Sequence, residues 1–270
     1  MNHYQITIPV VDEPLREVLI AQLTELGFDG FEESEKNLNA FIEEGLLDEK
    51  ELNKIIDLHY LSYSKSIIKK ENWNAIWESG FEPVRVDDFV GIRAGFHEPL
   101  KDVEHEIIIT PKMSFGTGHH ATTYTVMQLM QEIDFRGASV FDFGTGTGIL
   151  AILAEKLGAT DIVAVDYDDW CVENASENIL INSCQYIDIQ KNSTAENDRK
   201  FQVIIANINK NIILDNLHLL ADSLIHGGDI LLSGLLLEDE NDLLNACKSF
   251  GWKHVKTVSR GAWIAIWFKG

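Results

Sequence analysis

The sequence has 270 residues, 45% of them hydrophobic, and a formal net charge of −21 at pH 7. A mean hydropathy of −0.05 allows a sizeable core and argues against a disordered chain, and no apolar run reaches the ~18–20 residues of a membrane-spanning helix. The acidic charge disfavours free nucleic acid as a partner and favours basic partners.

Targeting and cysteine patterns predict a cytoplasmic protein that does not enter a membrane. The N-terminus shows neither the basic nor the apolar region of a signal peptide. The three cysteines are scattered and show no C-x-x-C spacing, which indicates a reducing compartment and argues against a structural zinc ion. They are Cys171, Cys184 and Cys247.

Residues 1–68 predict a small α+β domain. His3–Val10 alternates like a strand, and apolar residues at helical spacing follow it, with Pro14 near the start of the helix and Gly27 at its end. A hairpin over 30–43, a helix over 47–59 and an extended stretch over 60–68 complete a β-α-β-β-α-β order. This order is that of a ferredoxin-like module.

Residues 69–80 read as a linker with a short helix, in which Trp73 and Trp77 share one face. Residues 81–270 then predict a larger α/β domain. Its first strands are expected at 83–86, 89–93 and 105–110. Further strands alternate with helices near 139–143, 161–166, 186–190, 201–206 and 229–234. Two closing strands over 252–258 and 262–268 suggest a hairpin, so we expect a mostly parallel sheet with an antiparallel edge.

The stretch PKMSFGTGHHATT (111–123) joins glycines, histidines and hydroxyl side chains ahead of a helix over 124–132. Adjacent imidazoles such as His119 and His120 point in different directions and have no third ligand at metal-binding spacing, so a metal site is disfavoured. We expect a loop that folds over a ligand, with Thr122 or Thr123 as a possible helix cap.

The stretch FDFGTGTGIL (141–150) places Gly144, Gly146 and Gly148 between a buried strand and an aliphatic helix. Glycine in such a turn permits positive φ and lets a ligand touch the main chain, and the helix N-terminus behind it offers free N–H groups. Dinucleotide sites use G-x-G-x-x-G. The spacing here is G-x-G-x-G, which is typical of S-adenosylmethionine sites.

Asp166 ends the next predicted strand, 22 residues after Gly144. A carboxylate at this place can accept hydrogen bonds from two ribose hydroxyls. The alternative is that it caps the following helix, but Asp168 or Asp169 can serve that purpose.

Asn207 and Asn209 follow the strand of FQVIIANINKN (201–211), at the carboxyl end where α/β proteins bind ligands. An asparagine amide both accepts and donates hydrogen bonds, so it could hold a substrate amine or the amino-acid part of a cofactor. The alternative is an Asx turn into the next helix.

Together with the linker NWNAIWESGFEPV (72–84) and LSGLL (232–236), these stretches resemble the PrmA family of bacterial protein-lysine methyltransferases. The resemblance implies a class I methyltransferase domain of Rossmann type, S-adenosylmethionine as cofactor, and transfer of methyl groups to lysine or N-terminal amines of protein eleven of the large ribosomal subunit. It also implies that the N-terminal domain binds this basic ribosomal protein. The expected oligomeric state is a monomer.

The resemblance assigns site residues position by position. Asn207 is the candidate catalytic residue. The candidate cofactor contacts are Thr123, Gly144, Asp166 and Asn207, with Gly146 and Asp142 in the same turn, and Phe115 and Thr117 in the loop that closes over the cofactor. Two positions depart from the family pattern. Ala121 stands where Glu or Pro is common, and Asn209 stands where Leu is common, near the substrate channel.

Three other functions stay open at this point. An NAD-dependent oxidoreductase is disfavoured by the glycine spacing. A methyltransferase for another protein, a nucleic acid or a small molecule would share the cofactor site, but the acidic charge and the N-terminal domain weigh against the last two substrates. A module that only binds would not need the glycine turn, Asp166 and Asn207 together.

Overall fold

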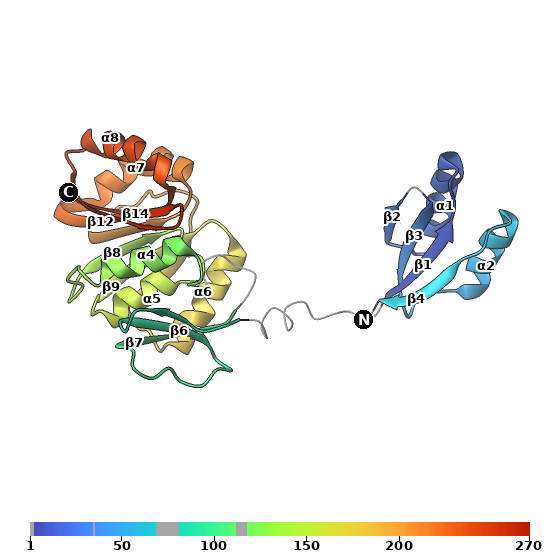
Figure 1. Ribbon diagram of the computed structural model, residues 1–270, viewed down its shortest axis with the longest axis horizontal. Helices are drawn as coiled ribbons and strands as arrows, with labels where there is room; N and C mark the ends of the chain where they lie inside the picture. Colours follow the sequence, from blue (N-terminus) through green and yellow to red (C-terminus); the bar gives the residue numbers. More distant parts are fainter. Residues whose placement is uncertain (1–2, 35, 69–80, 112–117) are drawn as a thin grey trace. The chain divides into compact units, whose positions relative to one another are not determined.

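The computed structural model describes residues 3–34, 36–68, 81–111 and 118–270 (Figure 1). The chain divides into two compact units, residues 1–76 and 77–270. None of the helices within these ranges has the length and apolar character needed to span a membrane.

The first unit is a four-stranded antiparallel sheet with two helices. Its elements are β1 (His3–Pro9), α1 (Glu13–Glu25), β2 (Gly30–Glu33), β3 (Asn37–Glu43), α2 (Glu49–Leu58) and β4 (Ser64–Ile68), in the predicted order. The strand order is β2-β3-β1-β4. Alternate residues such as Ile6 and Leu38 pack with Leu19 of α1 in one buried cluster. The second helix starts later than predicted because the carboxylate of Asp48 caps it.

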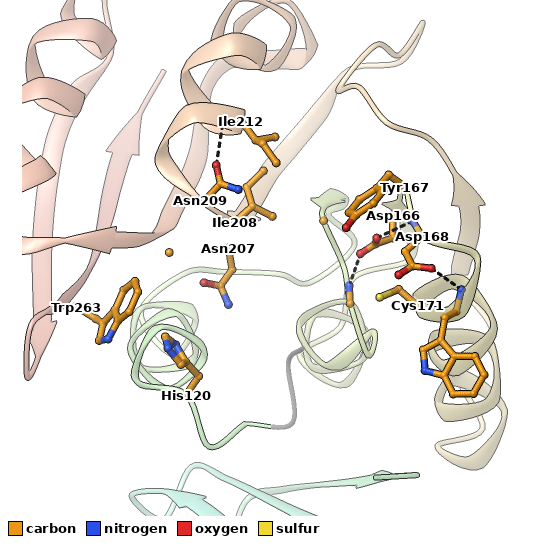
Figure 2. Close-up of a pocket in the computed structure, with 14 residues that line it drawn as sticks. His120, Asp166, Tyr167, Asp168, Cys171, Asn207, Ile208, Asn209, Ile212 and Trp263 are labelled. Carbon is orange, nitrogen blue, oxygen red and sulfur yellow. Dashed lines mark hydrogen bonds between the residues drawn. The ribbon is translucent and has the colours of Figure 1, made fainter. Parts of the chain in front are cut away.

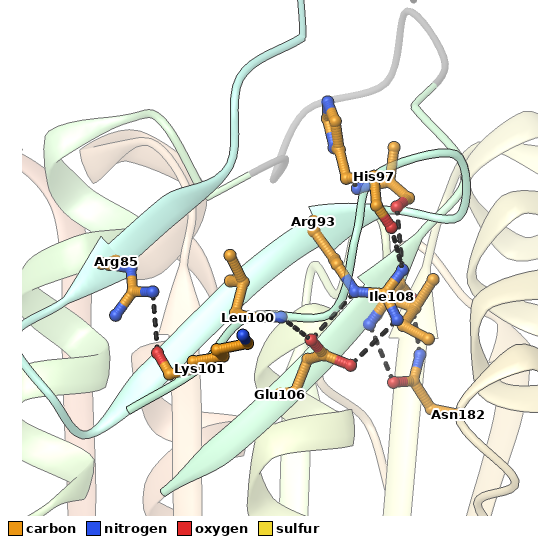
Figure 3. Close-up of polar contacts among 9 residues, drawn as sticks. Arg85, Arg93, His97, Leu100, Lys101, Glu106, Ile108 and Asn182 are labelled. Atoms are coloured by element: carbon orange, nitrogen blue, oxygen red, sulfur yellow. Dashed lines mark hydrogen bonds and ion pairs between the residues drawn. The ribbon is translucent and has the colours of Figure 1, made fainter. Parts of the chain in front are cut away.

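The second unit opens with a three-stranded sheet of β5 (Val84–Val86), β6 (Val90–Ala94) and β7 (His105–Ile109). The β6–β7 pair is parallel. The buried Arg93 of β6 donates to both carboxylate oxygens of Glu106 on β7, at 2.9 and 3.0 Å (Figure 3). Glu106 also accepts from the Leu100 N–H, and its bonds to Arg93 lower its pKa. This ion pair links the side chains of the two neighbouring strands.

The main sheet has seven strands in the order β10-β9-β8-β11-β12-β14-β13. The strands are β8 (Ser139–Phe143), β9 (Asp161–Asp166), β10 (Ile187–Lys191), β11 (Phe201–Asn207), β12 (Leu224–Leu236), β13 (Lys253–Arg260) and β14 (Trp263–Lys269). The first five run parallel, and β14 is antiparallel to β12 and β13. The predicted antiparallel edge is therefore confirmed.

Helices cover the main sheet through two separate buried clusters. Residues of α4 (Ala121–Met130), α5 (Ile149–Lys156) and α6 (Asp169–Ile181) belong to one cluster, and residues of α7 (Lys210–Ser223) and α8 (Glu240–Lys248) belong to the other. From β8 the chain continues to β9 and β10, which lie on one side of β8 in the sheet. It then crosses to β11, which lies on the other side of β8. This reversal opens a crevice at the carboxyl ends of β8 and β11.

One predicted helix start is wrong. We expected Thr122 or Thr123 to cap the helix before residue 124, but α4 already begins at Ala121. The Nδ1 atom of His120 accepts from the Thr122 N–H at 3.4 Å. Both threonines are fully buried within the first turn, so the residue that ends the loop, rather than the hydroxyl residues after it, caps this helix.

Candidate active site

A cavity of about 530 Å³ lies at the carboxyl ends of the central strands (Figure 2). The glycine turn after β8 and Asp166 at the end of β9 line one part of it, and the segment 207–209, which begins with the last residue of β11, lines another. A second cavity of about 370 Å³ shares Gly144, Asp166 and Tyr167 with the first and continues to Asn192. The cavity therefore lies at the edge of the sheet where the sequence predicts a binding site.

The glycine turn is shaped by three left-handed residues. Gly144, Gly146 and Gly148 have φ of 80°, 56° and 79°, a region that side chains disfavour. The N–H groups of Gly144 and Thr145 both donate to the Val165 carbonyl at 2.9 Å. Helix α5 begins directly after Gly148, so its positive dipole end lies behind the turn. The predicted strand, turn and helix are confirmed.

Asp166 connects the turn to the next strand. Its side chain is nearly buried, with 6% exposed, and it lines both cavities. Its Oδ2 accepts from the Gly146 N–H at 2.9 Å and its Oδ1 accepts from the Asp168 N–H at 3.1 Å. Asp168 caps α6, as one alternative in the sequence suggested. Each carboxylate oxygen has a further lone pair for a ligand.

Asn207 presents to the cavity a buried acceptor that has no hydrogen-bond partner in the described part of the chain. Its Nδ2 donates to the buried Thr123 hydroxyl of α4 at 3.2 Å, which fixes the orientation of the amide. Its Oδ1 is buried and has no hydrogen-bond partner among the described residues. A buried carbonyl without a partner costs about 1–3 kcal/mol. Such an atom beside a cavity indicates a ligand that donates a hydrogen bond there.

Asn209 lies on the same cavity but also has a structural task. It caps α7, because its Oδ1 accepts from the Ile212 N–H at 3.1 Å. The Asx-turn alternative therefore holds for Asn209. Ala121 is the first residue of α4. Phe115 and Thr117 lie outside the described residues.

Asp142 lies beneath the turn and is not among the residues that line the cavity. Its Oδ2 accepts from the Thr145 hydroxyl at 2.6 Å, and its Oδ1 has no partner within the described part of the chain. Burial, strengthened by the nearby charge of Asp166, raises its pKa from 3.8 to about 7. Asp142 is connected to the glycine turn by its hydrogen bond with Thr145.

This pKa predicts a pH-dependent effect of Asp142→Asn. Between pH 4 and 7 the folded state keeps a proton that the unfolded state has released, so wild-type stability falls as pH rises through this window. The asparagine variant lacks this titration. We expect its gain in unfolding free energy over wild type to be larger at pH 8.5 than at pH 5.5, by about 2 kcal/mol. Denaturant unfolding at both pH values measures it, and an equal gain at both would contradict the assignment.

Sequence reasoning placed His120 in a loop expected to fold over a ligand, but it missed Trp263, which forms an aromatic wall of the cavity with His120. The rings of His120 and Trp263 pack edge to face with centroids 4.7 Å apart, and both line the cavity. Figure 2 draws this pair on one side of Asn207 and Asp166 on the other. Burial lowers the pKa of His120, so the imidazole is neutral at pH 7. Trp263 comes from a distant strand, and no local pattern marks it.

A family model and two relatives that resemble this chain bear the same protein name. The family model "Ribosomal protein L11 methyltransferase (PrmA)" matches residues 19–270. A ribosomal protein L11 methyltransferase from Porphyromonas gingivalis is 40% identical over 264 residues, which cover 95% of this chain and 91% of that protein. One of the same name from Phocaeicola vulgatus is 35% identical and covers 99% of both chains.

A solved structure supports the fold. The crystal structure of a ribosomal protein L11 methylase from Lactobacillus delbrueckii subsp. bulgaricus superposes with a TM-score of 0.65 and 29% identity, covering 70% of this chain and 98% of that one. The α/β methyltransferase fold predicted from the sequence is thereby confirmed. Since the family model spans most of the chain and the relatives match nearly its full length, the chain belongs to the ribosomal protein L11 methyltransferase family.

Proposed function

We propose that this chain transfers methyl groups from S-adenosylmethionine to lysine side chains, the N-terminal amine, or both, of ribosomal protein L11. The observation that carries the proposal is one cavity with three features: a side-chain-free turn at Gly144 and Gly146, the carboxylate of Asp166, and the Oδ1 of Asn207, which lacks a hydrogen-bond partner among the residues that the structure describes. Family membership supports the reaction class, and the names of the relatives support the substrate.

The residues present fit this cofactor. Asp166 offers acceptors for ribose hydroxyls, and the glycine turn admits the amino-acid end of the molecule to the backbone. The Oδ1 of Asn207, oriented by Thr123, would accept from an ammonium or amine N–H. The second cavity, beside Tyr167 and Asn192, would take the purine. When bound, S-adenosylmethionine supplies an activated sulfonium methyl group.

The residues of the chain then have to prepare and align an amine. A lysine ammonium with a pKa near 10.4 has no lone pair for attack, and an apolar site lowers this pKa by desolvation. Ile208 and Trp263 supply apolar walls at this cavity. Asn207 would hold an N–H of the neutral amine and direct its lone pair to the methyl group. Solvent can take the released proton, so no dedicated base is needed.

The first unit is our candidate for binding the protein substrate. We assign residues 1–68 to binding, 69–80 to the linker and 81–270 to catalysis, with Phe115 and Thr117 covering the cofactor. A ribosomal protein is basic, and the formal charge of −21 favours its approach and disfavours free nucleic acid. A cytoplasmic monomer suits a substrate made on the ribosome.

Mass spectrometry of purified L11 tests the proposal. After incubation with this protein and S-adenosylmethionine, we expect mass gains in steps of one methylene, mapped by peptide fragmentation to lysine or N-terminal amines. L11 with its amines acetylated beforehand is the matched control and should gain no mass. If a different protein is methylated under the same conditions while L11 gains no mass, the assignment of L11 as the substrate is wrong.

Asp166→Ala should weaken S-adenosylmethionine binding at least 100-fold. The change removes the ribose acceptor and also frees the Gly146 N–H, and hydrogen bonds to charged groups contribute about 1.5–3 kcal/mol each. Titration calorimetry measures the affinity. Asp169→Ala is the control, because that carboxylate is exposed, pairs with Lys191 and is not among the described residues that line the cavity. Wild-type affinity in Asp166→Ala would remove the ribose role.

A further inference from the structure

Helix α6 and its C-terminal cap carry three asparagines at four-residue spacing, Asn174 and Asn178 within the helix and Asn182 as the cap residue. The first two side chains are fully buried. Asparagine competes with helical backbone hydrogen bonds and is uncommon in a helix interior. Buried amide groups in a row of this kind need hydrogen-bond partners, and those partners indicate the role of each asparagine.

Asn178 joins two separate segments through its single amide. Its Nδ2 donates to the Thr147 carbonyl at 2.9 Å, and its Oδ1 accepts from the Thr110 N–H at 2.8 Å. Thr147 lies in the glycine turn, and Thr110 directly follows β7. Both the donor and the acceptor of the amide are therefore used, and neither aspartate nor leucine could replace both bonds at neutral pH.

The same helix also packs closely on the turn one helical turn earlier. A Cβ added to Gly148 would lie 3.2 Å from the Cβ of Ala175. Ala175 is fully buried. Close packing at Ala175 and the hydrogen bond from Asn178 thus meet on neighbouring residues of the turn, Thr147 and Gly148.

Asn182 uses the same chemistry at another place. Its Oδ1 accepts from the Ile108 N–H at 3.0 Å and its Nδ2 donates to the Ile108 carbonyl at 2.6 Å (Figure 3). These bonds tie α6 to β7 without reaching the glycine turn. The row therefore contains its own matched control.

We propose that Asn178 is a positioning residue for the methyl donor, acting through the Thr147 carbonyl on the shape of the glycine turn. The inference rests on the proposed function. Thr147 is flanked by Gly146 and Gly148, and glycine gives the backbone its largest conformational freedom. The bonds to Val165 and Asp166 hold the first half of the turn. In the second half the Gly148 N–H donates to the Thr145 carbonyl at 2.9 Å, and Asn178 adds a bond to the Thr147 carbonyl. Without Asn178 this carbonyl loses that bond, and the peptide between Thr147 and Gly148 can shift out of the binding shape.

Calorimetric titration with S-adenosylmethionine tests this in wild type, Asn178→Leu, Asn178→Asp and Asn182→Leu. We expect the Kd to rise at least tenfold in Asn178→Leu, and in Asn178→Asp at pH 9. The loss in Asn178→Asp should shrink toward pH 6, because a protonated carboxyl can donate to the Thr147 carbonyl as the amide does. Asn182→Leu should lower the melting temperature but bind within threefold of wild type.

Amide hydrogen exchange of residues 146–149 without cofactor gives a second readout. Exchange should accelerate in both Asn178 variants and not in Asn182→Leu. A folded Asn178→Leu that binds within threefold of wild type overturns the inference, as does an equal loss of affinity in Asn182→Leu. If Asn178→Leu does not fold, Asn178→Asp at pH 9 decides in the same way. Failure of the proposed function is distinct, because the wild type itself would then not bind.

Discussion

Replacing Gly234 by alanine should reduce methyl transfer at least 100-fold. Gly234 lines the cavity with φ of 85°, and an added Cβ would lie 2.1 Å from the Ile208 carbonyl oxygen and 2.6 Å from its carbon. Backbone at this distance must move, and Ile208 directly follows Asn207. A displacement of about 1 Å in a reacting group can cost about 100-fold in rate. Overpacking and the left-handed strain should together lower stability by ~2–4 kcal/mol.

Gly251→Ala separates the two effects of this substitution. Gly251 has a φ of 77°, close to that of Gly234, but no atom lies within 4 Å of an added Cβ. It should show the backbone strain alone, with a small loss of stability and unchanged turnover. Steady-state methyl transfer and thermal unfolding of both variants measure the difference. Gly234→Ala with more than a third of wild-type turnover would show that Ile208 does not position the site.

Asn207→Ala should also reduce methyl transfer at least 100-fold, but with little loss of stability. The change removes the acceptor that orients the amine or holds the ammonium. It also removes a buried carbonyl that has no partner within the described chain. Relief of this desolvated atom offsets the loss of the bond to Thr123. An active-site group that lowers the stability of the free protein is expected where binding requires it.

Asn209→Ala should show the opposite pattern. It loses the cap of α7, which costs about 1 kcal/mol, while methyl transfer stays within about threefold of wild type. Melting temperatures and initial rates, measured side by side for the two variants, decide the case. An unchanged rate in Asn207→Ala would refute its catalytic assignment.

Local signals explain how much of this fold and site the sequence predicts. The glycine turn follows one buried strand, and Asp166 and Asn207 end two others. Each strand is recognisable from a few neighbouring residues, and the carboxyl ends of parallel strands meet at one edge. Strands β8 and β9 have the predicted bounds. The closing hairpin was also visible, because two extended runs follow each other directly.

Non-local contacts account for what the sequence does not reveal. The packing of His120 on Trp263 joins residues 143 positions apart, and the close approach of Gly234 to Ile208 depends on neighbouring strands. Asn178 carries no local mark, since an asparagine inside a helix gives no sign of the two segments it joins. The parallel pairing of β6 with β7 is accompanied by the contact of Arg93 with Glu106, which joins residues 13 positions apart.

Hydrogen bonds from within the chain hold the turn at residues 144–148 in its shape. Its N–H groups bond to Val165 and Asp166, and its Thr147 carbonyl bonds to Asn178. Such a preorganised surface spares an inhibitor the entropy of ordering a loop. Small adenosine fragments should therefore bind with high affinity per atom, and an added primary amine that reaches the Asn207 oxygen should strengthen them further.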